Sequence, residues 1–303
     1  MADITRAEVA SLIAEEYGPQ VIKAATQGST ALSAFPHVNM GTKTQNMPVL
    51  ATLPEADWVT DTDNSGVKPT AQVTWANKTL VAEEVAVIVP IHENTLDDAT
   101  EDILAQIAEL GGQAIGKKLD QAVFFGEDKP SSWTSLDLQA AAVAASNTVT
   151  IVDGDANTSD VWGATLQVAS IIADKGFDPT TAIAKRSLAF SLANLRNANG
   201  DPVLAGENLR GFDTFWSRNG AWVPADATVL LADPSTVRIG VRQDVTVKFL
   251  DQATLTGVGN LAEKDMVALR FKARFAYVLG NPATPETGTA SYGVGAVLPA
   301  VES

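Results

Sequence analysis

The sequence predicts an α+β fold, and three features carry that prediction. A long, turn-rich hairpin spans residues 44–77, one long amphipathic helix follows an apolar strand between residues 78 and 126, and a separate α/β segment begins near residue 136. Strands and helices therefore fall into blocks and do not alternate regularly, which is typical of α+β proteins. No recognisable catalytic motif accompanies these elements. The order predicts a protein built to associate with copies of itself.

Composition narrows the class of protein. The chain has 303 residues, 46% of them hydrophobic, with a mean hydropathy of +0.06, which is ordinary for a globular protein. No apolar run approaches the roughly 18 residues of a membrane helix, and the N-terminus lacks the pattern of a secretory signal. The chain has no cysteine, which excludes disulfides and thiolate chemistry. It has only two histidines, which nearly excludes a multi-histidine metal site.

The charge balance argues against some partners. A net charge of −15 makes broad adhesion to nucleic acid or to anionic membranes repulsive. The charge is compatible with a protein that encloses nucleic acid without binding it tightly.

The N-terminal region is predicted to be a helix followed by an arm. Residues 2–17 have the spacing of a short amphipathic helix, and residues 18–41 are irregular but too apolar to remain free in solvent. The hairpin then comprises an outgoing strand at residues 46–53 and a return strand at residues 70–76. A ribbon of this length is marginal alone in water, so we expect either the rest of the chain or another copy to cover it. Two tryptophans, Trp58 and Trp75, are its candidate contact residues.

A valine-rich strand at residues 83–91 leads into the long helix. This helix is expected to begin near Thr95 or Asp98 and to end at Gly126, with an apolar stripe at 3.6-residue spacing. The stripe comprises Ile103, Ile107, Leu110, Ala114, Ile115, Leu119, Ala122 and Val123. Gly111 and Gly112 each cost about 1 kcal/mol relative to alanine in a helix, which indicates a bend or the close approach of another backbone.

The second half is predicted from shorter signals. Residues 130–157 resemble a linker, and residues 159–175 and 187–197 have the pattern of helices around a short strand at 181–184. Strand patterns follow at residues 228–232, 237–241, 245–250 and 267–279. The last of these alternates strictly, with Arg270, Lys272 and Arg274 on its polar face. Pairing of these cations with carboxylates, across strands or between subunits, is favoured over nucleic-acid binding. The tail after residue 280 is rich in Pro, Gly and Thr.

Three motifs with possible chemistry are better explained as structure. GGQAIGKK at residues 111–118 departs from a phosphate-binding loop at its last position and lies inside the helical stripe. DTDNSG at 61–66 and DGDANTSD at 153–160 open like calcium loops but lack the required later ligand or glycine. His37 and His92 have no partner nucleophile in the sequence. We therefore predict no catalytic, cofactor or metal site.

Several stretches resemble the Hong Kong 97-type major capsid protein of tailed bacteriophages. They are VAVIVPIHENTLDD, GKKLDQAVFFG, KGFDPTTAIAKRSLAFSLANLRNANGDPVL, LLADPSTVRIGVRQDVTV and LAEKDMVALRFKARFAYVLGNP. Their order and spacing over residues 40–282 carry the resemblance. It implies a structural, non-enzymatic subunit that self-assembles into hexamers and pentamers of an icosahedral shell around the double-stranded DNA genome, with assembly in the bacterial host cytoplasm.

The resemblance also implies a division of the chain. The expected parts are an N-terminal arm at 1–36, an extended hairpin loop at 37–78, a peripheral domain with its spine helix (about 96–125) at 79–135, an axial domain at 136–254, and a return to the peripheral domain with a tail at 255–303. Its implied partners are further copies and a portal protein, with a separate scaffolding protein and a decoration or minor capsid protein as optional ones. The implied intersubunit contact residues are Trp58, Lys68, Trp75, Gly111, Gly112, Arg270, Lys272 and Arg274.

Some members of this family form a covalent cross-link between a hairpin lysine and an asparagine beside a glutamate. Lys68 is a candidate donor, but the corresponding late-strand positions are Asp265 and Lys272, so no self-catalysed cross-link is expected. Two rival hypotheses are an encapsulin, which is a cellular nanocompartment of the same fold, and a nucleotide-binding enzyme that uses GGQAIGKK.

Overall fold

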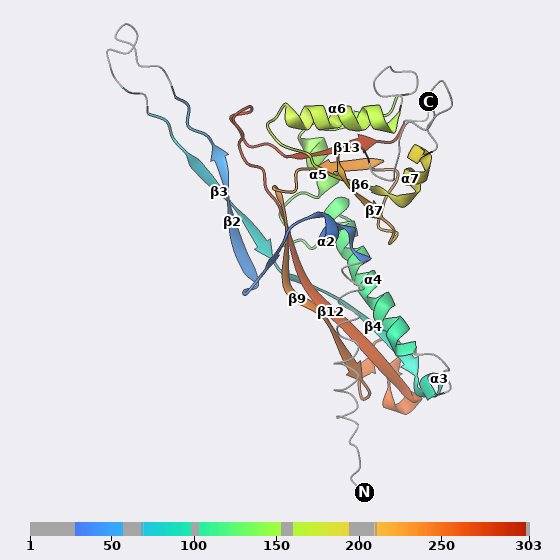
Figure 1. Ribbon diagram of the computed structural model, residues 1–303. Coiled ribbons are helices and arrows are strands. Elements are labelled where there is room, and N and C mark those ends of the chain that lie inside the picture. Colours follow the sequence, from blue (N-terminus) through green and yellow to red (C-terminus); the bar gives the residue numbers. More distant parts are fainter. Residues whose placement is uncertain are drawn as a thin grey trace.

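Two β-sheets and a projecting two-stranded ribbon form the fold (Figure 1). The computed structural model describes residues 28–56, 68, 70–97, 103–152, 160–193, 209 and 211–300.

The first sheet is long and narrow. Its strand order is β1 (His37–Asn39), β9 (Val237–Leu250), β12 (Met266–Leu279) and β4 (Glu83–His92). The last three strands are antiparallel neighbours, whereas β1 runs parallel to β9. Strict alternation in β12 places its apolar side chains on one face, and these residues are buried.

One helix covers the apolar face of this sheet. Helix α4 (Ile103–Phe124) lies along β12 and β4 after the short α3 (Glu93–Asp97), as Figure 1 shows. Its buried side includes Ile115, Leu119, Ala122 and Val123, as the stripe predicted, and also Ala108, which the predicted stripe left out. Leu110 and Ala114 were wrongly placed in that stripe, because both are exposed. Leu110 is 63% exposed because the helix turns Gly111 toward the sheet instead.

The second sheet has five short strands between helices. Their order is β5 (Thr148–Thr150), β13 (Val294–Leu298), β8 (Val229–Ala232), β6 (Thr181–Lys185) and β7 (Asp213–Ser217). Helices α6 (Val161–Ala173) and α7 (Arg186–Ala193) pack on one face, while α5 (Leu138–Ala144) packs on the other. Carboxylates cap two of these helices: Asp137 accepts a hydrogen bond from the Ala140 N–H over 2.9 Å, and Asp160 accepts one from Gly163 over 2.6 Å.

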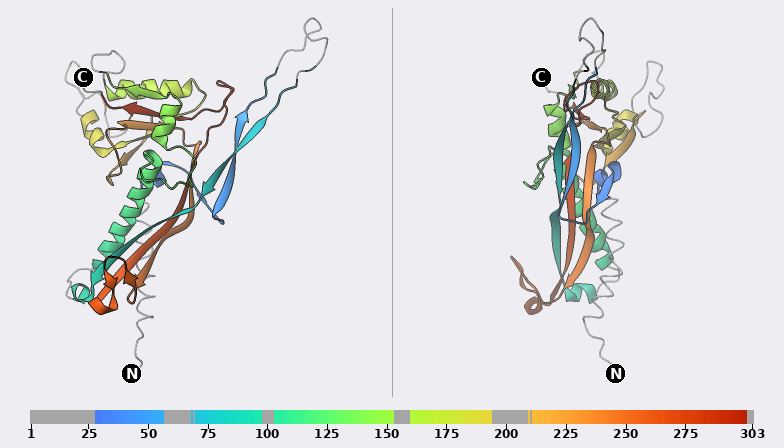
Figure 2. Two further views of the ribbon diagram at one scale, coloured as in Figure 1. Left: turned by 180° about the vertical axis from the view of Figure 1, so that it is seen from behind. Right: turned by 90° about the vertical axis from the view of Figure 1, so that its left-hand side faces the viewer.

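The predicted hairpin is present and projects from the body of the molecule. It consists of β2 (Thr44–Thr52) and β3 (Thr74–Val81), and the left-hand view in Figure 2 shows it extending away from the two sheets. Its base is buried where Leu80 packs with Met40 and with residues of β12, and Val49 further along β2 is buried as well. Beside Val49, the Leu50 carbonyl accepts a hydrogen bond from the Ala283 N–H over 2.8 Å. The remaining small elements are α2 (Thr30–Ala34), β10 (Thr254–Leu255), β11 (Gly259–Asn260) and the 3-10 helix η1 (Ala262–Lys264).

The sheets divide the chain differently from the predicted ranges. Residues 237–250, expected in the axial segment 136–254, form β9 in the elongated sheet. Residues 294–298, expected to belong with the peripheral part, form β13 in the five-stranded sheet. The region expected to be a linker contains α5 and β5, and the arm contains α2 and β1. The elements α2, β1, α5 and β5 are short and are held by contacts with distant parts of the chain, so local sequence patterns did not reveal them. The helix predicted at residues 2–17 lies outside the described residues.

No helix within the described ranges is both long and apolar enough to cross a bilayer.

Candidate assembly surfaces

The projecting hairpin exposes large apolar side chains. Trp75 on β3 is 67% exposed, and Val73 just before that strand is also exposed. Lys68, further toward the tip, is exposed as well, while Trp58 lies outside the described residues. At the outer end of the described ribbon, the hydroxyls of Thr52 and Thr74 lie 2.6 Å apart and bridge the two strands. An exposed indole on a ribbon with little burial of its own is typical of a contact site for another protein.

A band of cations lies on the face of the elongated sheet that α4 does not cover. Phe271 on β12 points toward α4, so its neighbours Arg270, Lys272 and Arg274 point to the opposite face. The Lys272 ammonium lies 2.6 Å from Oε2 of Glu84 on β4. The expected pairing of this cation with a carboxylate across strands is therefore confirmed within the chain.

Another part of this band places like charges opposite each other. Arg270 stands directly opposite Lys248 of β9, and like charges facing each other across a sheet are destabilising. The Nε atoms of Arg270 and Arg274 are buried and have no hydrogen-bond partner. Arg274 makes one long contact, from Nη2 to the Ala82 carbonyl over 3.4 Å. Buried Nε atoms without an acceptor favour a partner that supplies one.

The two glycines proposed as intersubunit contacts are buried within the chain. A Cβ atom on Gly111 would lie 2.7 Å from Cδ2 of Phe271, so glycine is what allows α4 to approach β12 this closely. Gly112 is also buried. The prediction of a close approach at Gly111 was correct, but the approaching group is a side chain of the same molecule. The prediction that Gly111 and Gly112 contact another copy is therefore wrong, because both are buried inside this one.

A buried carboxylate attaches the arm to the long helix. Asp120 on α4 is fully buried and accepts hydrogen bonds from the Ser29 hydroxyl (2.7 Å), the Thr30 N–H (2.8 Å), the Ala31 N–H (3.0 Å) and the Asn219 side chain (2.8 Å). Burial raises the pKa of the Asp120 carboxyl, and the hydrogen bonds from Ala31, Ser29, Thr30 and Asn219 oppose that rise. The start of α2 is thereby held in one position against α4.

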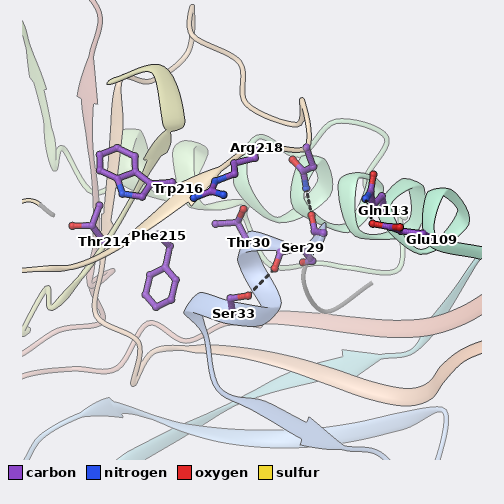
Figure 3. Close-up of a pocket in the computed structure, with 11 residues that line it drawn as sticks. Ser29, Thr30, Ser33, Glu109, Gln113, Thr214, Phe215, Trp216 and Arg218 are labelled. Atoms are coloured by element: carbon purple, nitrogen blue, oxygen red, sulfur yellow. Dashed lines mark hydrogen bonds between the residues drawn. The ribbon is translucent and has the colours of Figure 1, made fainter. Parts of the chain in front are cut away.

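A cleft of about 400 Å³ opens beside this attachment, between α2, α4 and the end of β7. Figure 3 shows Ser29, Thr30 and Ser33 on one side, Glu109 and Gln113 on another, and Arg218 between them and Trp216. Its lining mixes hydroxyls, one carboxylate and one guanidinium and holds no nucleophile paired with a base.

Of the remaining sequence motifs, only GGQAIGKK lies wholly among the described residues. GGQAIGKK lies entirely within α4, so the phosphate-loop hypothesis is wrong for want of a preceding strand and turn. Among the described residues no group of three or more possible metal ligands occurs. DTDNSG and most of DGDANTSD lie outside those residues. Sequence analysis missed Asp120, for which the one available signal was an acidic residue inside the apolar stretch of the helix.

Comparison with known proteins identifies the family. A model of the Phage capsid family matches residues 10–284. A solved structure from Mycobacterium phage Adephagia is 56% identical, with a TM-score of 0.84 and coverage of 100% of both chains. One from Microbacterium phage Oxtober96 is 39% identical, with a TM-score of 0.78, and covers 98% of this chain and 100% of that one. No curated protein matches the sequence.

A more distant structure shows how far the fold extends. It is described as the capsid of a native GTA particle computed with C5 symmetry, and it shares 16% identity over 92% of this chain and 90% of that one, with a TM-score of 0.61. Because the family model spans most of the sequence and two closely similar structures cover nearly all of it, the protein belongs to the phage capsid family and is a structural component of a bacteriophage capsid rather than an enzyme.

Proposed function

We propose that this chain is the major capsid protein of a tailed bacteriophage, which self-assembles into the hexamers and pentamers of an icosahedral shell enclosing double-stranded DNA. The observation that carries the proposal is the hairpin β2–β3, which extends beyond the core and leaves Trp75 exposed. A ribbon that buries so little of itself gains stability when another copy covers it.

The elements correspond to the parts of the Hong Kong 97-type fold. The hairpin is the extended loop, α4 is the spine helix, the elongated sheet forms the peripheral domain, and the five-stranded sheet with its helices forms the axial domain. The sheet pairings support moving β9 to the peripheral domain and β13 to the axial domain.

Charge gives the assembly a complementary surface. The chain has 36 acidic and 21 basic side chains, yet the uncovered face of the elongated sheet brings together Lys248, Arg270, Lys272 and Arg274, of which Lys272 pairs with Glu84. A neighbouring copy is rich in the carboxylates that these cations lack. Each such contact is modest alone, but many contacts per subunit add up in a closed shell.

The shell is proposed to hold without covalent bonds between subunits. Lys272 is already paired with Glu84, and Asp265 offers a carboxylate where the cross-linking members have an amide. Denaturing electrophoresis of assembled particles should give a single band at the monomer mass, whereas a ladder of multimers would contradict this. A portal protein and, in addition, a scaffolding or decoration protein are proposed partners.

Negative-stain electron microscopy of the purified protein, or of virions that contain it, tests the proposed function. Closed polyhedral particles are expected. An encapsulin would also give particles, but the similarity to structures from mycobacterial and microbacterial phages favours a phage shell. A protein that stays dispersed as a monomer at high concentration contradicts the proposal.

A further inference from the structure

The long helix α4 exposes a large apolar side chain, Leu110. This side chain is 63% exposed, whereas Ile115 and Leu119 elsewhere on the helix are buried. Gln106 and Gln113 are exposed as well. Positions 106, 110 and 113 are spaced by four and three residues, so their side chains form one row along the helix. A row of this spacing with a leucine in its middle is a surface on which a second helix can pack.

The described part of the arm begins on the same row. A Cβ atom on Gly28 would lie 3.0 Å from Cα of Gln113, so the absence of a side chain lets the arm come this close to the backbone of α4. The Asn219 side chain donates a hydrogen bond to the Gly28 carbonyl and helps to hold it there. This point of attachment is about one helical turn from Leu110.

From Thr30 back to Gly28 the arm steps along α4 toward the N-terminal end of that helix. The Thr30 N–H donates a hydrogen bond to Asp120 over 2.8 Å. Gly28, two residues earlier in the arm, lies on Gln113, which is seven residues earlier in α4. The next exposed position of α4 in that direction is Leu110.

The residues before Gly28 have the sequence of a short helix. Pro19 is of the type favoured at the first position of a helix. The backbone of Gly28 is helical and that of Ser29 is extended, which is the change expected where a helix ends. The positions three, four and seven residues before Gly28 share its side of a helix, and they hold Ala25, Ala24 and Val21. That side is therefore apolar throughout.

The apolar side of this segment matches the exposed row of α4 in length. A helix rises about 1.5 Å per residue, so seven residues span about 10 Å in both. With Gly28 on Gln113, Val21 comes level with Gln106, and the two alanines come level with Leu110. Alanine side chains are small enough to leave room for the leucine between two closely packed helices.

We propose that residues 19–28 form a helix parallel to α4 of the same chain, with its apolar side over Leu110. The segment ends at Gly28 itself, so it has no linker through which to reach another molecule while Gly28 lies on Gln113. This inference goes beyond the proposed function, because it assigns the root of the arm to the body of its own subunit. Contacts of the arm with neighbouring copies are then left to residues 1–18.

Disulfide trapping in the full chain tests this packing, because the protein has no cysteine of its own. The pair Ala25→Cys and Leu110→Cys places two thiols on facing sides of the helices. The matched control is Thr26→Cys with Leu110→Cys, which moves one thiol to the opposite side of the proposed helix. Under the same mild oxidation the first pair should close about tenfold faster or more, since a disulfide needs Cα atoms within about 7 Å. Mass spectrometry of mixed light and heavy-isotope chains should find these bonds within single chains.

Hydrogen exchange of the unmodified chain provides a measurement that needs no variant. The amides of residues 23–28 should be protected as in a helix. Leu110→Asp should speed their exchange about tenfold, whereas Leu166→Asp, at another exposed leucine, should leave it unchanged. Equal trapping by the two cysteine pairs, bonds between light and heavy chains, or exchange at the rate of an unstructured peptide overturns the proposal. Self-assembly is tested separately by microscopy and stands or falls independently of these results.

Discussion

The Ser29 hydroxyl donates a hydrogen bond to Oδ1 of Asp120 over 2.7 Å, and 91 positions of sequence separate the two residues. This contact and the two adjacent backbone donors, Thr30 and Ala31, bind the start of α2 to a carboxylate that has no exposed surface. The start of α2 is therefore held against the long helix by one of that helix's side chains.

Asp120→Asn should destabilise the subunit by about 2–4 kcal/mol. The asparagine amide cannot accept hydrogen bonds at its nitrogen, so it would face donors that the carboxylate now satisfies. Urea unfolding of the unassembled protein measures the change. Asp128→Asn is the control, because Asp128 is an exposed residue that pairs with Lys118, and its loss should leave the transition nearly unmoved.

The same carboxyl predicts a pH dependence. Its pKa is raised in the folded state above 3.8, so between the two values the folded protein holds more protons than the unfolded chain. The stabilisation from this group is complete below the unfolded pKa and is lost as pH rises through the folded pKa. The difference in unfolding free energy, wild type minus Asp120→Asn, should accordingly increase in favour of wild type on acidification from neutral pH toward pH 4. A difference that shrinks on acidification would show that the hydrogen bonds outweigh burial.

Gly111→Ala should destabilise the protein by about 1–3 kcal/mol, even though alanine is the better helix former by about 1 kcal/mol. The new methyl group would lie 2.7 Å from the Phe271 ring and would push α4 away from β12. Gly41→Ala is the control, since a Cβ there meets no atom within 4 Å. Thermal unfolding of both variants, and of Gly111→Ala combined with Phe271→Leu, measures the effect. Recovery of stability in the double variant is expected, and its absence would place the strain elsewhere.

Arg270→Glu should weaken assembly without lowering the stability of the subunit. The new carboxylate would stand opposite Lys248, so a like-charge pair within the sheet becomes an ion pair, while the surface offered to a neighbour loses two units of positive charge. Light scattering during assembly and urea unfolding of the subunit measure the two effects separately. Lys117→Glu makes the same change in net charge on α4, away from this face, and serves as the control. Unimpaired assembly of Arg270→Glu would remove the cationic band from the proposed interface.

Elements with strong local periodicity were predicted well from the sequence. The alternation in residues 267–279 gave β12 almost to the residue, and the 3.6-residue stripe before Gly126 gave the end of α4. The start of the helix was predicted near Thr95 or Asp98, whereas the structure has the short α3 at Glu93–Asp97 and begins α4 at Ile103. The short helices and strands in alanine- and glycine-rich segments, α5 and β13 among them, were missed. They owe their structure to pairing and packing with distant residues and not to their own pattern.

The functional surfaces divide in the same way. Trp75 could be named as a contact candidate from the sequence because a two-stranded ribbon buries little surface by itself. The shared face of the cations on β12 could be predicted from the alternation of apolar and polar residues. The attachment at Asp120 joins segments far apart in sequence, and no spacing rule brings them together. Gly111 shows the limit most clearly, because the sequence indicated a close approach but not which group approaches.

Shortening of the hairpin tests the central claim most directly. A chain in which residues 53–73 are replaced by Asn-Gly keeps β2, β3 and both sheets, and it should show an unchanged cooperative unfolding transition. Electron microscopy and sedimentation should find closed particles for the full chain and only small, open species for the shortened one. Identical particles from both chains, or a stable monomer from the full chain at high concentration, would contradict the conclusion that this ribbon completes its burial on a neighbouring copy.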